Sequence, residues 1–205
     1  MEFLKKTIAI LTVFIAFNSY AQDYKTLQDA FANSITLESS SNFKGAIEVI
    51  KKVNTPTNYE TNVRLGWLSY EAGNHVESKS YYEKAATLMP ASTEPLWGLT
   101  YPLAELKKWS ELFNIYLKII KLDPKNMTAN YRLGLSAYYS KEYIAAKKYF
   151  DIVLGLYPMD YNALLMSAWT NYFLGKKTEA KILFNKTLMV MPDDKSATEG
   201  LALFK

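Results

Sequence analysis

The chain has 205 residues, of which 49% are hydrophobic and 21% are charged, and its formal net charge at pH 7 is +4. The large apolar fraction argues against intrinsic disorder, and the small net charge argues against a nucleic-acid partner. The chain contains no cysteine, which excludes disulfide bonds, cysteine-ligated zinc and thiol catalysis.

Residues 1–21 have the pattern of a secretory signal peptide. Two lysines precede an apolar run, 7–17, that is too short to cross a hydrocarbon core of about 30 Å as a helix. Ser19 and Ala21 are small residues at the positions that a signal peptidase recognises. We therefore predict cleavage after Ala21, a secreted or periplasmic mature chain over residues 22–205, and no integral membrane span.

The remainder of the chain is periodic, with a repeat of about 34 residues that corresponds to the interval between Pro90 and Pro124. Four prolines are spaced by this period, and an aromatic residue lies eight positions before each: Tyr82 before Pro90, Tyr116 before Pro124, Phe150 before Pro158, and Phe184 before Pro192. Within 130–158, apolar and small residues recur at helical spacing on both sides of a turn near residues 140–142. The pattern predicts helix-turn-helix units in which the recurring rings fill the space between repeats.

The period divides the chain into five repeats and a short final helix. A glycine, Gly73 or Gly175, lies at the turn inside two of the repeats, where a left-handed residue can end the first helix. The first repeat is the least regular of the five. The expected repeats cover about 25–58, 59–92, 93–126, 127–160 and 161–194, and the capping helix covers 195–205.

This pattern resembles the tetratricopeptide repeat, in which W-x2-L-G-x2-Y, A-x3-F and P recur over about 34 residues. The Leu-Gly pair is present as Leu65-Gly66 and again, in the same register, as Leu133-Gly134. The resemblance implies an all-α fold, a right-handed superhelical solenoid of about five helix-turn-helix repeats with a C-terminal capping helix. It also implies a concave groove, lined by the first helices, that usually takes a peptide or a partner helix.

The predicted groove is rich in aromatic residues. In the family, the fifth, ninth and twelfth positions of each repeat face the concave side, and here eight of these twelve residues are aromatic. The eight are Trp67, Tyr70, Trp97, Tyr101, Tyr131, Tyr138, Trp169 and Tyr172. The rings could form a binding surface, or they could pack between neighbouring helices, and the sequence leaves both alternatives open.

Two arginines, Arg64 and Arg132, occupy the sixth position of their repeats and are the only arginines in the chain. In chaperone-binding members of the family, an arginine at this position helps to hold a C-terminal carboxylate. The companion lysine and asparagine are missing here, because Val63 and Trp67 stand in their places. We therefore expect no complete carboxylate clamp. Each arginine either binds a single anionic group or forms a salt bridge with a neighbour, and we favour the salt bridge.

The sequence contains no pattern of catalytic, metal-binding or cofactor-binding residues. His75, the only histidine, occupies a slot that aromatic residues fill in later repeats, so it is expected to pack rather than to react. We predict a non-catalytic protein-interaction module, a scaffold or adaptor of the cell envelope without a cofactor, that binds a protein or peptide in the groove. Carbohydrate or cell-wall binding by the same rings is the main alternative, and a lysine-bearing convex face against acidic lipid or protein is another.

Overall fold

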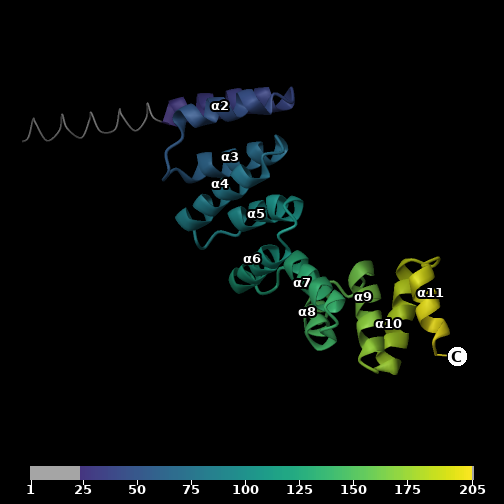
Figure 1. The fold of residues 1–205 in the computed structure, drawn as a ribbon. Helices are drawn as coiled ribbons and strands as arrows, with labels where there is room; N and C mark the ends of the chain where they lie inside the picture. The colour runs from purple at the N-terminus through teal and green to yellow at the C-terminus, as the bar shows by residue number, and fades with distance from the viewer. Residues whose placement is uncertain (1–23, 205) are drawn as a thin grey trace, which may run out of the picture. The chain divides into compact units, whose positions relative to one another are not determined.

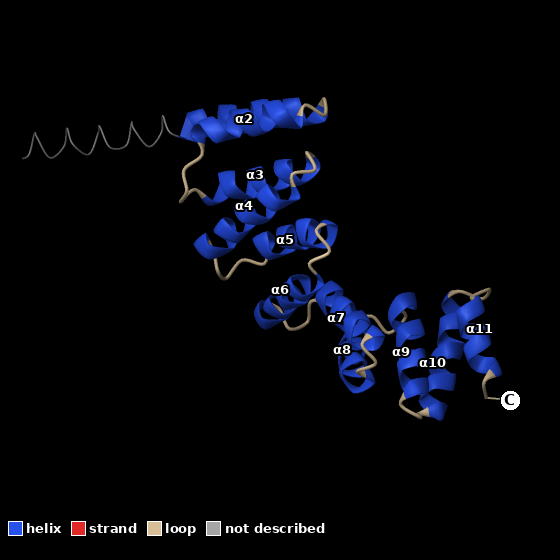
Figure 2. Cartoon of the chain, viewed as in Figure 1, coloured by secondary structure: helices blue, strands red, loops and turns tan. Residues whose placement is uncertain are grey.

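The computed structural model describes residues 24–204, and these contain helices and connecting turns without any strand (Figures 1 and 2). The signal peptide predicted at 1–21 lies outside the described residues. The helices are, in order, residues 24–39, α2 (Phe43–Val53), α3 (Tyr59–Glu71), α4 (His75–Leu88), α5 (Glu94–Glu105), α6 (Trp109–Leu122), α7 (Met127–Tyr139), α8 (Tyr143–Leu156), α9 (Tyr161–Phe173), α10 (Lys177–Val190) and α11 (Lys195–Ala202).

The chain forms two compact units, which meet in the sequence between Lys107 and Lys108. Unit 1 contains the helix over 24–39 and α2 to α5, and unit 2 contains α6 to α11. Within each unit, helices that follow one another in the sequence pack together, as α3 does with α4 and α7 with α8. First helices of successive repeats also touch, since α3 contacts α5 and α7 contacts α9. This sequential packing confirms the all-α prediction and is consistent with a helical solenoid.

A repeated polar cap fixes where most of the first helices begin. Asn58, Asn126, Asp160 and Asp194 precede α3, α7, α9 and α11, and each side chain accepts a hydrogen bond from the backbone N–H three residues further on. Such a cap satisfies one of the backbone donors that the first turn of a helix leaves unpaired. The capping residue is therefore a local feature of the sequence that fixes the residue at which the first helix of the repeat begins.

The turn between the two helices of a repeat contains a residue with left-handed backbone geometry. Gly73 and Gly175 have φ values of 76° and 74°, which confirms their predicted role. Ser41, Lys107 and Lys141 adopt the same conformation with φ values of 59°, 55° and 62°. The repeat therefore imposes this geometry even where the residue carries a side chain that disfavours it.

Substitution of Gly175 by alanine is expected to lower the free energy of unfolding by about 1 kcal/mol, because alanine disfavours a left-handed backbone. A Cβ atom at this position would meet nothing within 4 Å, so the backbone alone carries the cost. Gly155 provides the control, since its Cβ would also meet nothing and it lies inside α8. Gly155→Ala should stabilise the protein by roughly 0.5–1 kcal/mol. Thermal unfolding should show opposite shifts, and shifts of the same sign would contradict the assigned turn.

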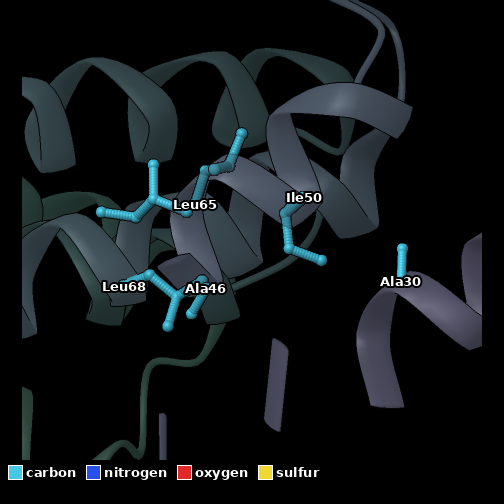
Figure 3. Packing of buried hydrophobic residues seen from close by; sticks show 6 residues of the cluster. Ala30, Ala46, Ile50, Leu65 and Leu68 are labelled. Carbon is cyan, nitrogen blue, oxygen red and sulfur yellow. The ribbon is translucent and has the colours of Figure 1, made fainter. Parts of the chain in front are cut away.

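The core of unit 1 lies between the helix over 24–39, α2 and α3. Ala30, Ala46, Ile50, Leu65 and Leu68 gather there as buried hydrophobic residues (Figure 3). Small alanines allow the helices to approach one another, and the longer side chains fill the space between them. Phe31 and Trp67 are half-buried and pack against this core.

In three of the repeats, a buried aromatic ring packs directly against the backbone of one or two glycines. A Cβ atom on Gly66 or Gly98 would lie 2.9 or 2.2 Å from atoms of the Tyr82 ring. A Cβ atom on Gly134 would lie 2.6 Å from the ring of Phe150, and a Cβ atom on Gly200 would lie 2.3 Å from the ring of Phe184. Three of the four rings predicted to fill the space between repeats are thus buried, whereas the fourth, Tyr116, is half-buried.

Candidate functional site

A hollow of about 390 Å³ lies on the first helices of unit 1. Its walls come from the helix over 24–39, from α3 and from the first turn of α5. The lining residues are Phe31, Tyr59, Glu60, Val63, Arg64, Trp67 and Glu94. A hollow of this size with apolar walls and a few polar groups has the usual character of a ligand site.

Glu38 holds two of the lining residues in place. Its carboxylate lies 2.6 Å from Nη2 of Arg64 and accepts a hydrogen bond of 2.6 Å from Nε1 of Trp67. Nε of Arg64 also donates to Oγ of Ser34 at 2.9 Å. Desolvation by itself would raise the pKa of Glu38, but the bonds from Trp67 and Arg64 and the charge of Arg64 outweigh it, so the pKa lies below its usual value. The carboxylate is therefore charged at neutral pH.

Arg64 is consequently committed to an internal ion pair. Its side chain is only 14% exposed, and its charge is compensated by Glu38. Of the two roles that the sequence left open for this arginine, the structure shows the salt bridge, with a partner on the helix over 24–39. An incoming anion would have to compete with a carboxylate that is already in place.

An aromatic cluster adjoins the hollow on α3 and α5. The ring centroid of Trp67 lies 6.0 Å from that of Tyr70 and 6.3 Å from that of Tyr101, and the two tyrosine rings are 5.4 Å apart. Tyr101 is 48% exposed, whereas Trp67 and Tyr70 are half-buried. These three predicted groove residues therefore form one continuous aromatic surface, of which Tyr101 is the most accessible part.

A tyrosine at the start of α3 positions the carboxylate at the rim of the hollow. The hydroxyl of Tyr59 donates a hydrogen bond of 2.6 Å to Oε2 of Glu94 and lies 3.3 Å from Oγ of Ser92. Burial and the bond to Glu94 raise the pKa of Tyr59 above its usual value. In unit 2, Tyr161 donates in the same way to Asp194. The bond thus ties the first helix of one repeat to the beginning of the next.

The predicted groove residues of unit 2 contact neighbouring side chains of the same unit. Trp169 donates from Nε1 to Oγ of Ser196 at 2.9 Å, and its ring lies 5.0 Å from buried Phe184. Three further predicted rings, Tyr131, Tyr138 and Tyr172, are half-buried and each contacts another ring: Tyr131 contacts Phe150, Tyr138 contacts Phe173, and Tyr172 contacts Phe204. Arg132 is exposed and forms no ion pair within residues 24–204, so the salt bridge expected for this arginine is wrong.

A second hollow, of about 370 Å³, lies in unit 2 between α6, α7 and the turn that precedes α8. None of the predicted groove residues lines it. Its lining residues are Trp109, Ser110, Phe113, Asn114, Ser136, Ala137, Ser140 and Glu142. Both polar and apolar side chains line this hollow.

The eight predicted groove aromatics differ little in their exposure. Seven of the eight, Trp97 among them, are half-buried, and only Tyr101 is exposed. Sequence reasoning missed Phe31, Glu38 and Tyr59, and it missed the two rim carboxylates. A signal for the carboxylates was present, because Glu60 and Glu94 occupy the same position of successive repeats. Phe31 gave no such signal, since the first repeat is irregular.

Within residues 24–204, no group of three or more histidine, cysteine or acidic side chains is placed to hold a metal ion. The half-buried ring of His75 lies 5.6 Å from that of Tyr70, as expected for a packing residue. None of the helices in this part of the chain is both long enough and apolar enough to cross a membrane.

Comparison with known proteins identifies the class. Residues 59–92 match the family model of the tetratricopeptide repeat. A tetratricopeptide repeat protein from Parabacteroides merdae superposes with a TM-score of 0.71 at 22% identity, over 87% of this chain and 72% of the other. The chain therefore contains a tetratricopeptide repeat and has the fold of tetratricopeptide repeat proteins, as the sequence pattern indicated.

Two further solved structures are similar at the level of the fold. The MamA protein superposes with a TM-score of 0.68 at 21% identity, over 88% of this chain and 96% of its own. YrrB, described as a tetratricopeptide repeat protein with an unusual peptide-binding site, has a TM-score of 0.66 at 16% identity, over 83% and 89% of the two chains. No curated protein sequence matches the chain. This fold is generally a non-catalytic scaffold for protein interactions.

Proposed function

We propose that the protein is an interaction module of the cell envelope that binds an extended segment of a partner protein on the first helices of unit 1. The observation that carries this proposal is the hollow between Phe31, Val63 and Trp67, which continues into the rings of Tyr70 and Tyr101. An apolar side chain of the partner would enter the hollow, and the neighbouring part of the segment would lie over the exposed ring.

Internal bonds also fix the geometry of the site. The bond from Trp67 to Glu38 and the ion pair of Arg64 fix two walls of the hollow relative to the helix over 24–39. A binding surface that is already ordered loses less conformational entropy on association. Partly buried tryptophan and tyrosine residues are also the side chains that most often dominate binding energy at protein interfaces. The peptide-binding site named for YrrB, which shares the fold, supports the same proposal.

Tyr101→Ala is expected to weaken peptide binding by about thirtyfold, because the loss of an aromatic hot-spot residue costs roughly 2 kcal/mol. Short random peptides displayed on phage would be selected with the chain over residues 22–205, and the selected peptides would be titrated against both proteins. Tyr139→Ala is the matched control, since Tyr139 is 75% exposed and lies outside the site. Both variants should unfold near the temperature of the parent protein.

Unchanged affinity of the Tyr101→Ala protein would place the binding surface elsewhere. A glycan array, incubated with the same proteins, separates the carbohydrate alternative, because sugar faces also stack on exposed aromatic rings. Glycan binding that Tyr101→Ala abolishes, without any selected peptide, would replace the peptide proposal.

The envelope location proposed here is supported by the signal-peptide pattern of residues 1–21. Mass spectrometry of the protein isolated from its native host should find an N-terminus at Gln22. An intact Met1 in the soluble fraction would contradict secretion and leave the interaction proposal untouched.

A further inference from the structure

Two first helices of unit 1, α3 and α5, carry four exposed carboxylates at matching positions of their repeats. Glu60 and Glu94 occupy the second position of successive repeats, and Glu71 and Glu105 occupy the thirteenth position of the same two repeats. No ion pair of these four residues is found in the described part of the chain. The acidic side chains thus form two columns, one at each end of α3 and α5.

The corresponding positions of unit 2 carry no charge. The second position is Thr128 or Asn162, and the thirteenth is Tyr139 or Phe173. Neither α3 nor α5 contains a lysine, and their single arginine, Arg64, is neutralised by Glu38. Negative charge is therefore a property of α3 and α5 and not of the repeat in general. A surface with one sign of charge attracts partners of the opposite sign.

The two acidic columns border the aromatic surface and the hollow. Glu60 and Glu94 line the hollow itself. Glu71 and Glu105 lie close enough to Tyr70 that, after burial, their charges contribute to its raised pKa. On α3 the two columns are separated by the eleven residues from Glu60 to Glu71, a distance of about 16 Å at about 1.5 Å of rise per residue. An extended chain covers that distance with about five residues.

We propose that the ligand of this site is a basic segment, in which lysine or arginine side chains flank an apolar residue. This inference rests on the proposed function above and specifies its ligand. The apolar residue would enter the hollow beside Val63 and Trp67, and the flanking cations would pair with the two acidic columns. A cation beside the exposed Tyr101 ring would gain a further attraction from its π system. A segment that ends in a free carboxylate is disfavoured, because Arg64 already pairs with Glu38.

Three fluorescein-labelled peptides test the proposal by fluorescence anisotropy. One intersperses lysine with leucine and phenylalanine, and the others replace every lysine with glutamate or with serine. The chain over residues 22–205 should bind the lysine peptide at least about tenfold more tightly than the glutamate peptide at low salt. Raising the salt concentration should reduce the difference, because the Debye length falls from about 10 Å at 0.1 M to about 3 Å at 1 M.

A matched pair of variants then locates the charges responsible. The first variant carries glutamine at the four acidic positions, Glu60, Glu71, Glu94 and Glu105, and should bind the lysine peptide about tenfold more weakly. The control carries glutamine at Glu48, Glu142, Glu179 and Glu199, which are exposed and do not belong to α3 or α5. It has the same net charge as the first variant, and its affinity should stay within about twofold of the parent.

Each other outcome decides against the inference. Equal loss in both variants would show a general effect of net charge, and tighter binding of the glutamate peptide would reverse the assignment. No binding of the lysine peptide at all would also overturn it. If all three peptides bind equally and Tyr101→Ala weakens each of them, the basic ligand is wrong and the proposed groove function stands. If Tyr101→Ala changes none of them, the groove function itself fails.

Discussion

Replacement of Phe150 by alanine is expected to lower the free energy of unfolding by about 3–5 kcal/mol. The side chain is 0% exposed, its ring lies 5.9 Å from that of Tyr131, and it packs directly on the backbone of Gly134. Its removal would leave a cavity between α7 and α8 that the backbone cannot close without moving a whole helix. Denaturant titration followed by circular dichroism measures the change.

The control for this experiment is Tyr139→Ala, because Tyr139 is 75% exposed on the same helix pair. A surface substitution of this kind usually changes stability by less than about 0.5 kcal/mol. Similar losses in the two variants would show that Phe150 does not lie in the core of the repeat. The register on which the site residues were assigned would then be wrong as well.

The second large effect is expected from Gly98→Ala, which should destabilise the protein by about 1–3 kcal/mol through overpacking. The new Cβ atom would lie 2.2 Å from Cε1 of Tyr82, far inside van der Waals contact. Glycine to alanine inside a helix ordinarily stabilises by up to about 1 kcal/mol, so the sign of the change identifies the contact. Thermal unfolding of the single variant is sufficient to measure the sign.

A double-mutant cycle with Tyr82→Leu isolates the contact itself. Leucine removes the part of the ring that meets Gly98, so Gly98→Ala should cost less in that background. We expect a coupling energy of about 1 kcal/mol or more, as for residues in direct contact. Additive effects would mean that α5 and α4 do not meet through these two residues.

The packing that these variants probe also explains how the candidate site obtains its shape. Tyr82 can approach α3 and α5 closely because Gly66 and Gly98 have no side chain. The close approach brings Trp67 and Tyr70 of α3 next to Tyr101 of α5. A substitution that separates the helices should therefore weaken ligand binding as well as stability, even though neither glycine lines the hollow.

The sequence by itself determined the helices and their order. The repeat period placed the beginnings of the first helices, and α3, α7, α9 and α11 begin at Tyr59, Met127, Tyr161 and Lys195, each the first residue of an expected repeat or of the cap. The determinants are local: the side-chain caps before these helices, and apolar residues at helical spacing within them. Local determinants of this kind are visible in the chain without knowledge of its partners.

Only the tertiary structure decided which partners the side chains of the groove residues have. Arg64 and Trp67 both bond to Glu38, which lies more than twenty residues earlier, in the irregular first repeat. No pattern in the sequence pairs these residues, because the choice depends on how the helix over 24–39 docks on α3. The same docking brings Phe31 into the wall of the hollow. Periodicity identifies the face of a helix on which a side chain lies, but the partner of that side chain is set by the rotation and distance at which the next helix packs.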